Sequence, residues 1–363
     1  MTNHASGGAE GVAGSSSFLL YGSYGYTGRL VARLAVERGL QPVLAGRDGE
    51  ALEQQAGRLR LPHLVFSLED SGALDRALSD VPLVLHCAGP FSRTFRPMVE
   101  ACLRTRRHYL DITGEIDVFE GAAALGARAA EAGIMLLPGV GMDVVPTDCL
   151  AAHLKRRLPT ASRLTLAIFS RGGVSRGTAL SMLERLGQQG MVRQGGRLTP
   201  VPAGWKSRTF DFGDGPYSAI TIPWGDVATA YHTTGIGDIE VYAAAPPRLQ
   251  RAMRATGRLG WLLRSPLVRR VLGQAVRRRV TGPSAGQRAR GEMRAFGEVT
   301  DDAGASASAV LIGPEGYTFT ARTAVAVVER VLGGEAPPGF QTPARAYGPD
   351  FVLEIEGTSR KDL

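Results

Sequence analysis

The chain has 363 residues, of which 44% are hydrophobic and 21% are charged, and its formal net charge is +8. This length allows two domains with sizeable cores, and the composition excludes a disordered or fibrous chain. Three cysteines without paired spacing exclude a disulfide framework and a thiolate metal site of the usual form, so we expect a reducing, cytoplasmic location.

Residues 1–17 contain neither a basic start nor an apolar stretch, and they are rich in glycine and serine. These features indicate a disordered leader rather than a signal peptide. No later apolar run reaches the roughly 18 residues that a membrane-spanning helix needs. We therefore expect ordered structure to begin at Phe18.

A strand, a tight turn and a helix are predicted between residues 18 and 39. The apolar run that begins at Phe18 is followed by glycines at positions 22, 25 and 28, then by apolar residues at helical spacing and by Gly39. Glycine permits backbone conformations that a Cβ forbids, and it lets a pyrophosphate approach the N–H groups of a helix N-terminus. A second strand over 41–45 follows at the distance of a βαβ unit, which favours a dinucleotide-binding turn over glycines that serve the fold alone.

The end of the second predicted strand indicates which dinucleotide is bound. NAD-binding folds usually place an acid there for the ribose 2′-hydroxyl, whereas a 2′-phosphate needs a cation. This strand ends in Gly46-Arg47, and a guanidinium can bind a phosphate through two hydrogen bonds. Asp48 follows at once, where the N-cap of the next helix is expected. The sequence therefore predicts NADP(H) as the cofactor.

Strands alternate with helices up to about residue 146. Further strands are predicted at 64–66, 83–87, 109–111 and 134–137, with helices around 72–79, 95–105 and 116–131. This alternation predicts an α/β fold in which residues 18–146 form a Rossmann-like, doubly wound parallel sheet. Ligands of such a sheet lie at the carboxyl ends of its strands.

Several residues at those strand ends are candidates for cofactor binding. Asp70 is placed either to accept a hydrogen bond from the adenine amino group or to cap the helix that follows. The Gly89-Pro90 turn holds the backbone rigidly where the nicotinamide half of a dinucleotide lies. His86 lies inside an apolar strand, and we interpret it as a core histidine rather than as an acid or a base.

Four polar residues in or after the fifth and sixth strands are candidates for the substrate pocket, namely Tyr109, Asp111, Glu115 and Asp143. A hydride-transfer enzyme needs positioning and a donor for developing negative charge, because the cofactor carries the difficult step. Asp111 and Glu115 have the alternative role of capping the helix after Gly114. No Ser/His/Asp arrangement, H-E-x-x-H motif or His/Cys cluster is present, so we expect neither hydrolytic chemistry nor a metal.

Beyond residue 146 the pattern becomes irregular and predicts an α+β substrate domain over 147–335, which supplies the substrate side of a cleft between domains. Its predicted strands are 164–169, 206–211 and 238–244, its helices are 177–190, 225–233 and 320–332, and a hairpin joins 293–300 to 306–312. The segment 336–363 is rich in proline and glycine, and we expect it to pack back on the body.

The stretch from residue 241 to 291 contains twelve arginines and no acid. It predicts two helices, one over 248–263 and one that opens with Ser265 as N-cap and Pro266 as its first residue. On the second helix an apolar face is predicted opposite arginines 269, 270 and 277, and it consists of Leu267, Val268, Val271, Leu272 and Ala275. Two partners would suit the segment 248–279: an anionic membrane surface, bound peripherally, or an acidic acyl-carrier protein. The alternative is that the segment packs on the core and exposes its basic side to solvent. Nucleic acid is excluded, because stacking aromatic residues are almost absent there.

The motifs together resemble a known family. They are GSYGYTG, LAGR, CAGPF, HYLDITGE, GVGMDVVPTD, TGPSAGQRARGEM, EGYTFTA and GFQTPARAYGPDFVLEIEGT. This set resembles the saccharopine dehydrogenase-like oxidoreductases over nearly all of the chain after the leader, and within them the trans-acting enoyl reductases of bacterial lipid and polyketide assembly. The resemblance implies an NADP(H)-binding Rossmann domain, a C-terminal domain that holds substrate, and hydride transfer in the cleft between them. The cofactor contacts that it implies are Gly22, Ser23, Tyr24, Gly25, Tyr26, Thr27, Gly28, Arg47, Gly89, Pro90 and Phe91.

One motif departs from the saccharopine-reducing members of the family. In those relatives the loop that matches 139–148 approaches the nicotinamide and is followed by a substrate-binding histidine. This chain has no histidine after the loop until His153, which argues against an amino-acid substrate of that kind. Three hypotheses remain: reduction of an activated C=C bond in a lipid-like, small-molecule or carrier-bound acyl substrate, reduction or oxidation at a C=N or C–N bond, and a non-catalytic NADP-binding protein at a lipid surface. Asp143 and Tyr109 are the candidate catalytic residues.

Overall fold

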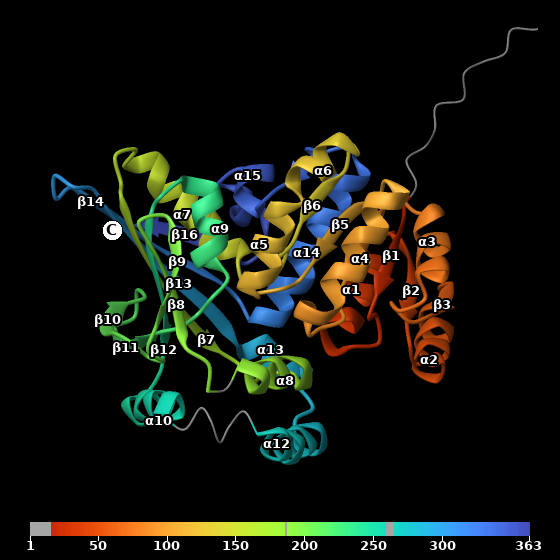
Figure 1. Cartoon of the computed structure of the whole chain (residues 1–363), viewed down its shortest axis with the longest axis horizontal. Coiled ribbons are helices and arrows are strands. Elements are labelled where there is room, and N and C mark those ends of the chain that lie inside the picture. The colour runs from red at the N-terminus through yellow and green to blue at the C-terminus, as the bar shows by residue number, and fades with distance from the viewer. Residues whose placement is uncertain (1–15, 186, 259–264) are drawn as a thin grey trace, which may run out of the picture.

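The computed structural model describes residues 16–185, 187–258 and 265–363. The chain forms two sheets that lie beside one another, with helices around and between them (Figure 1). The predicted leader falls outside the described residues, except for Ser16 and Ser17. Ser17 is already the first residue of a strand, so ordered structure begins one residue earlier than expected.

The first sheet has seven strands in the order β15-β6-β5-β4-β1-β2-β3, and each pair is parallel. The predicted doubly wound parallel sheet is therefore confirmed. Its strands are β1 (Ser17–Tyr21), β2 (Gln41–Gly46), β3 (His63–Val65), β4 (Leu83–His86), β5 (His108–Asp111), β6 (Met135–Leu137) and β15 (Gly339–Phe340).

Helices cover both faces of this sheet. They are α1 (Tyr26–Glu37), α2 (Gly49–Leu59), α3 (Ser71–Ser79), α4 (Phe91–Thr105), α5 (Ile116–Ala124) and α6 (Gly126–Glu131). Alternate residues of β1 belong to different cores, since Phe18 and Leu20 pack in one apolar cluster and Leu19 and Tyr21 in another. A strand buried on both faces is apolar throughout, which is why the run that begins at Phe18 shows no alternation.

Two helix predictions around the first sheet need correction. The stretch 116–131 is two helices, α5 and α6, separated at Leu125. Helix α4 begins at Phe91 rather than near residue 95, because a carboxylate distant in sequence, that of Glu115, accepts hydrogen bonds from the N–H groups of Phe91 and Ser92. Such a cap from a distant loop leaves no local signal in the helix itself.

The second sheet has nine strands, of which seven follow the order β10-β11-β12-β7-β13-β14-β16, while β8 pairs with β12 and β9. Its strands are β7 (Arg163–Arg171), β8 (Gly190–Gln194), β9 (Arg197–Val201), β10 (Ser207–Asp211), β11 (Pro216–Thr221), β12 (Asp238–Ala244), β13 (Glu292–Thr300), β14 (Ser306–Pro314) and β16 (Ser359–Asp362). The predicted hairpin is confirmed as β13 and β14. The short strands β8, β9, β11 and β16 were not predicted.

One core joins the two sheets. Helix α14 (Gly316–Leu332) packs against α1 and β4 of the first half and against β14 of the second sheet. Figure 1 shows it in the middle of the molecule. Helix α7 (Val145–Arg157) packs against β13 and α9 (Asp226–Thr234). The C-terminal segment contributes β15 to the first sheet and β16 to the second, with α15 (Pro343–Tyr347) and the 3₁₀ turn η1 (Phe351–Glu354) between them.

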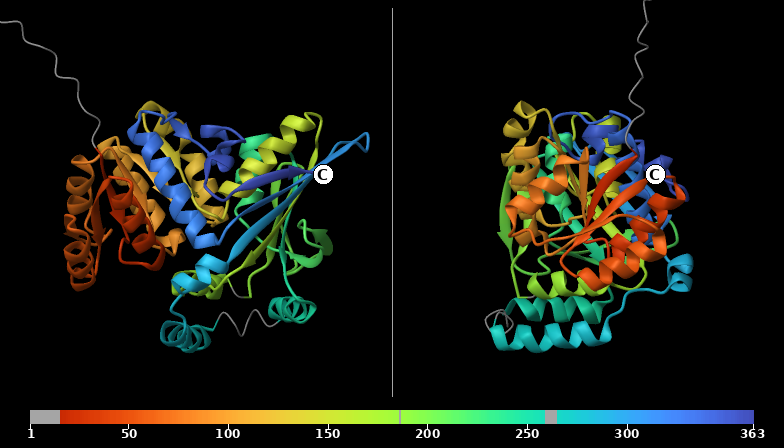
Figure 2. Two further views of the ribbon diagram at one scale, coloured as in Figure 1. Left: turned by 180° about the vertical axis from the view of Figure 1, so that it is seen from behind. Right: turned by 90° about the vertical axis from the view of Figure 1, so that its right-hand side faces the viewer.

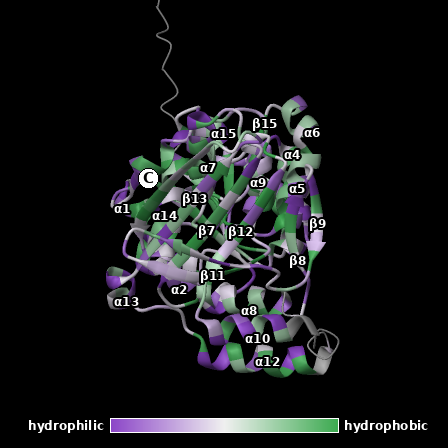
Figure 3. Cartoon of the chain, turned by 90° about the vertical axis from the view of Figure 1, so that its left-hand side faces the viewer, coloured by the Kyte–Doolittle hydropathy of each residue, from purple (hydrophilic) through white to green (hydrophobic). Residues whose placement is uncertain are grey.

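The basic helices α10 (Pro247–Arg258) and α12 (Pro266–Arg279) lie at one end of the molecule and are separated from one another in Figure 1 and in the left view of Figure 2. Helix α12 packs against α8 (Arg176–Arg185), and α10 packs against β11. Figure 3 shows hydrophilic and hydrophobic residues interleaved along both. The last residues of the first predicted basic helix, 259–263, lie outside the described residues. Among the described helices, none is long and apolar enough to cross a bilayer.

The predicted apolar face of α12 is rotated in the structure. Arg269 faces α8, where its Nη2 donates to the carbonyl of Glu184, and Gly273 approaches the Leu183 side chain. Val271 is 58% exposed, so it points away from the core with the neighbouring arginines.

Candidate cofactor and active site

The turn between β1 and α1 is built for close backbone approach. Gly22 has a φ of +81°, and a Cβ there would lie 2.8 Å from the Cβ of Ala88 after β4. A Cβ on Gly28 would collide with the Gly22 carbonyl, so α1 starts directly against the turn. Gly25 is the N-cap, and no side chain caps the helix. The first N–H groups of α1 are thus left for an external acceptor, as an anion site requires.

The end of β2 lies beside that turn. The ring of Tyr24 covers Gly46, where any Cβ would overlap it, and the N–H of Arg47 donates to the Tyr24 hydroxyl at 3.4 Å. The Arg47 side chain is exposed, and across the described ranges no carboxylate pairs with it. Asp48 caps α2 by accepting from the N–H of Ala51 at 3.1 Å, as predicted. Its charge is therefore held at the helix start.

Ser23 and Asp70, two of the predicted cofactor contacts, form hydrogen bonds within the protein. The Ser23 side chain is fully buried, its hydroxyl donates to Oε1 of Gln55, and Nε2 of Gln55 donates to the Ser23 carbonyl. Gln55 was missed in the sequence, since a glutamine on a helix carries no motif. Asp70 caps α3 through the N–H of Ala73 at 2.9 Å, which bears out the capping alternative. Its contact with adenine remains a prediction.

Hydrogen bonds of Glu115 and His86 hold the turn after β4 and the helix that follows it. Both carboxylate oxygens of Glu115 are used, one by the N–H of Phe91 and one by that of Ser92, each at 2.9 Å. His86 is fully buried, its Nε2 bonds the Thr94 hydroxyl at 2.8 Å, and burial lowers the pKa of the ring to about 3. The interpretation of His86 as a core histidine is confirmed.

Asp111, at the end of β5, organises the loops beside it. Its Oδ1 accepts from the N–H of Thr113 at 2.9 Å and of Gly139 at 2.8 Å, and its Oδ2 accepts from the hydroxyl of Tyr109 at 2.6 Å. Burial raises the pKa of Asp111 to about 6, and these hydrogen bonds oppose the rise. The structural alternative for Asp111 and Glu115 is right in part: Glu115 is the N-cap residue of α5, but no side chain caps that helix, and both carboxylates bind backbone N–H groups elsewhere.

Tyr109 lies on β5 with no exposed surface. Its phenol packs edge-on against Phe95, with ring centroids 5.6 Å apart, and its pKa is raised well above the ordinary value by burial and by Asp111. The structure therefore places the hydroxyl behind the strand ends rather than at their surface.

The loop after β6 connects the two sheets. Gly139 turns it with a φ of +77°, the N–H of Met142 donates to the Thr320 hydroxyl at 3.0 Å, and the Trp224 indole N–H donates to the carbonyl of Asp143 at 2.5 Å. The Asp143 carboxylate lies against Gly114, where a Cβ would be 2.8 Å from Oδ2. Thr320 and Trp224 were missed, because both come from the irregular half of the sequence.

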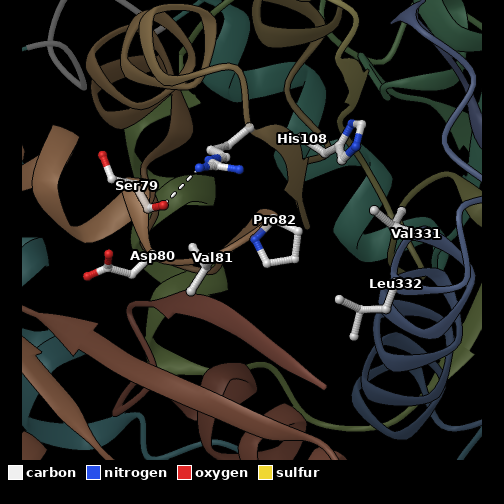
Figure 4. A pocket seen from close by; sticks show the side chains of 8 residues that line it. Ser79, Asp80, Val81, Pro82, His108, Val331 and Leu332 are labelled. Atoms are coloured by element: carbon white, nitrogen blue, oxygen red, sulfur yellow. Dashed lines mark hydrogen bonds between the residues drawn. The ribbon is translucent and has the colours of Figure 1, made fainter. Parts of the chain in front are cut away.

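Two cavities lie away from these residues. One of about 280 Å³ lies beside the amino ends of β4 and β5, lined by Pro82, Arg107 and His108 (Figure 4), and the other of about 340 Å³ is lined by His232, Phe340 and Arg345. The first is at the opposite edge of the sheet from the glycine turn. Within the described ranges, no group of three His, Cys, Asp or Glu residues could hold a metal ion.

The residues present fit a dinucleotide phosphate. The open N-terminus of α1 suits the pyrophosphate. The exposed guanidinium of Arg47, which pairs with no carboxylate among the described residues, suits a 2′-phosphate. The bare backbone at Gly22, Gly25 and Gly28 leaves no side chain between the phosphates and the helix N–H groups.

Comparisons with known proteins agree with this geometry. Residues 18–137 match the family model of the saccharopine dehydrogenase NADP binding domain. A trans-acting enoyl reductase of Mycobacterium leprae is 32% identical over 148 residues, which are 39% of this chain and 35% of that protein. A saccharopine dehydrogenase-like oxidoreductase of Mus musculus is 27% identical over 213 residues, 51% of this chain and 50% of that protein. The chain thus spans between a third and a half of these curated relatives.

The solved structure of the apo, L-Glu-forming saccharopine dehydrogenase of Saccharomyces cerevisiae has the same fold. It superposes with a TM-score of 0.67 at 12% identity, over 96% of this chain and 99% of that one. The predicted fold class and the predicted resemblance are confirmed. Residues 18–137 thus match the NADP-binding domain of saccharopine dehydrogenase, and the chain as a whole is similar in fold to that enzyme.

Proposed function

We propose that the protein is an NADPH-dependent reductase of an activated C=C bond in a lipid-like or acyl-thioester substrate. Similarity to the trans-acting enoyl reductases of Mycobacterium leprae and Mycobacterium ulcerans supports this reaction class. The choice between a C=C and a C=N substrate depends on the carboxylates near the nicotinamide side of the first sheet.

The observation that carries the choice is that two of these carboxylates are already used by the protein. Asp111 accepts from Tyr109 and two backbone N–H groups, and Glu115 binds the first two N–H groups of α4. Reduction of an imine needs a protonated nitrogen and benefits from a nearby carboxylate. Hydride addition to an enoyl group leaves an enolate oxygen, which needs hydrogen-bond donors and no ionised acid.

The residues of the chain divide into binding and positioning roles. When bound, NADPH supplies the hydride. The turn from Gly22 to Gly28 holds the pyrophosphate, Arg47 holds the 2′-phosphate, and the Gly89 to Phe91 turn, fixed by Glu115, supports the nicotinamide. Tyr109 acts as a positioning residue through Asp111, which ties the loop after β5 to the loop that carries Asp143.

The second candidate function is a C=N or C–N oxidoreductase of the saccharopine dehydrogenase type. Asp143 favours it, because its carboxylate lies at the strand ends where an iminium would need it. His153 disfavours it, since this first histidine after the loop is buried in α7 and bonds Asp362 of β16 at 2.7 Å. The His153 ring is thus hydrogen-bonded to a strand of the second sheet.

A carrier-bound or lipid-embedded substrate agrees with the basic helices. Helices α10 and α12 expose arginines together with Leu249 and Val271, which are 52% and 58% exposed. An acidic acyl-carrier protein or an anionic membrane surface would complement this face. Helix α8 connects it to the site, because Glu184 contacts Arg269 of α12 by its carbonyl and Arg93 of α4 by its carboxylate at 3.2 Å.

Incubation of the purified chain with NADPH and a panel of substrates tests the proposal. The panel contains 2-enoyl thioesters of several chain lengths and, separately, pairs of an oxo acid and an amine that form imines. We expect NADPH consumption and a saturated acyl product with the thioesters. A secondary amine as the sole product would favour the second candidate, and NADPH binding without turnover on any substrate would favour a non-catalytic role.

A further inference from the structure

A segment of the second sheet's half of the chain, residues 281–288, lies against the glycine turn of the first. The Tyr26 hydroxyl donates to the carbonyl of Pro283 at 2.5 Å, and a Cβ on Gly282 would lie 2.5 Å from Cε2 of the Tyr26 ring. The Tyr317 ring meets Tyr26 edge-on, with centroids 4.8 Å apart. The first residue of α1 therefore has its side-chain contacts in the other half of the molecule.

Arg288, on the short helix α13 (Ala285–Arg290), joins this contact. Its Nη1 donates to the Tyr26 hydroxyl at 2.9 Å and to the Pro283 carbonyl at 3.1 Å, and both acceptors are neutral. Over the described ranges, no carboxylate forms an ion pair with this guanidinium. Burial raises the pKa of Glu315 and the charge of Arg288 opposes the rise, but the Glu315 carboxylate already accepts hydrogen bonds from the N–H groups of Tyr317 and Thr318 at the start of α14.

The position of this charge is unfavourable without an anion. The N-terminus of α1 already carries a partial positive charge and unpaired N–H groups, so a nearby guanidinium raises the electrostatic energy. Guanidinium has five N–H donors, and only those of Nη1 have partners among the described residues. An anion between Arg288 and the helix start would satisfy both groups.

The segment that carries Arg288 is held in place independently of any ligand. Ser284 and Gln287 form a reciprocal capping box at the start of α13, and Nε of Arg176 donates to the carbonyl of Val280 at 3.2 Å. A cation fixed in position before binding gives up little conformational entropy when it meets its ligand.

We propose that Arg288 is a cofactor-binding residue that donates hydrogen bonds to the pyrophosphate of NADPH, across the boundary between the two halves of the chain. The inference rests on NADP binding and not on the identity of the reduced bond. It assigns different phosphates to two arginines, the 2′-phosphate to Arg47 and the pyrophosphate to Arg288. NADH contains the pyrophosphate and lacks the 2′-phosphate. Loss of the Arg288 contact should therefore weaken the binding of both NADPH and NADH, whereas loss of the Arg47 contact should weaken the binding of NADPH alone.

Calorimetric titration of the full chain separates them. The variants are Arg288→Gln, Arg288→Lys and the matched control Arg290→Gln, an exposed arginine on the same helix. The ligands are NADPH, NADH and adenosine 2′-monophosphate, which has no pyrophosphate. We expect Arg288→Gln to weaken NADPH and NADH alike, by about tenfold, as loss of a hydrogen bond to a charged group does. Binding of adenosine 2′-monophosphate should not change, Arg288→Lys should be intermediate, and Arg290→Gln should match the wild type.

Amide hydrogen exchange gives a second readout. Saturating NADPH should slow exchange over 281–290 in the wild type, and not in Arg288→Gln. Equal NADPH affinity in Arg288→Gln and Arg290→Gln would overturn the proposal, as would an equal loss for adenosine 2′-monophosphate, which would mean a general disturbance of the fold. If the Gln variant does not fold, the Lys variant decides by the same criteria. A wild type that binds no NADPH would overturn the cofactor assignment together with this contact.

Discussion

Replacement of Arg47 by alanine should convert the protein from an NADPH binder into one that accepts NADH almost as well. Arg47 ends β2, its side chain is exposed, and within the described ranges no acid pairs with it. The competing carboxylate of Asp48 is directed to the N–H of Ala51. The guanidinium is therefore available to the 2′-phosphate without first breaking an ion pair.

The exposure of the Arg47 side chain determines how much NADPH binding free energy the substitution should remove. A hydrogen-bonded charge pair contributes up to about 3 kcal/mol, and solvent at this open strand end reduces it, so we expect a loss of about 2 kcal/mol. That corresponds to roughly thirtyfold weaker NADPH binding. NADH binding should change less than about twofold, because no negative group of NADH faces Arg47.

The assay is titration of protein fluorescence with each dinucleotide, at low and moderate salt. Arg58→Ala is the matched control, since Arg58 is an exposed arginine on the adjoining helix α2. Salt should weaken NADPH binding in the wild type and in the control more than in Arg47→Ala. Equal losses for NADPH and NADH in Arg47→Ala would refute the assignment of the 2′-phosphate to this residue.

Three further predictions address the active site, its stability and the basic face. Asp143→Asn should lower kcat by less than about tenfold, or about 1.4 kcal/mol, if the substrate is a C=C bond, whereas a thousandfold loss with intact NADPH binding would favour a C=N substrate. The pKa of Asp111 is raised from 3.8 to about 6, so its contribution to stability is present below pH 4 and is lost as pH rises through 6. Urea unfolding should therefore show Asp111→Asn gaining on the wild type between pH 4 and pH 7, and a constant difference would contradict the shift. The amount of protein that sediments with anionic liposomes should fall as salt is added and when Arg270, Arg277 and Arg278 are changed to Gln. Each arginine near the membrane surface should contribute about 1 kcal/mol of binding free energy. Binding that changes neither with salt nor with these substitutions would mean that this face is only solvated.

The first half of the fold was predictable because its signals are local. Glycines at 22, 25 and 28 mark the turn, Gly46-Arg47 ends β2, and Asp48 caps the helix that follows. Asp48 caps the helix through the N–H of Ala51, three positions away, and the glycines lie in the turn between two consecutive elements. The same locality explains the success with the hairpin of β13 and β14, whose turn residues are adjacent in sequence.

The rest of the site depends on contacts between distant parts of the chain. The start of α4 is set by Glu115, which lies 24 residues from Phe91. The loop with Asp143 is held by Trp224, 81 positions away, and the Tyr26 hydroxyl meets Pro283, 257 positions away. No periodicity or spacing in a single sequence reports such pairs, so Glu115 and Asp143 were predicted as pocket residues without these partners, and Trp224 was missed.

The small strands of the second sheet were missed for a related reason. Strand β11 has three buried residues at one end and exposed or half-buried residues at the other, so it lacks a sustained alternation. Strands β8 and β9 form an outlying hairpin that pairs with β12 only at its edge. Their positions are set by tertiary pairing, which overrides weak local preference.

The central claim is hydride transfer from NADPH to the carbon of an activated C=C bond, and the fate of a labelled hydride tests it most directly. The enzyme is given NADPH that carries deuterium at the transferable position, together with a 2-enoyl thioester, and the product is analysed by mass spectrometry and NMR. We predict a saturated thioester with one deuterium at the β-carbon and an unlabelled solvent proton at the α-carbon. Deuterium that appears only on the carbon beside nitrogen of a secondary amine, in reactions supplied with an oxo acid and an amine, would contradict it.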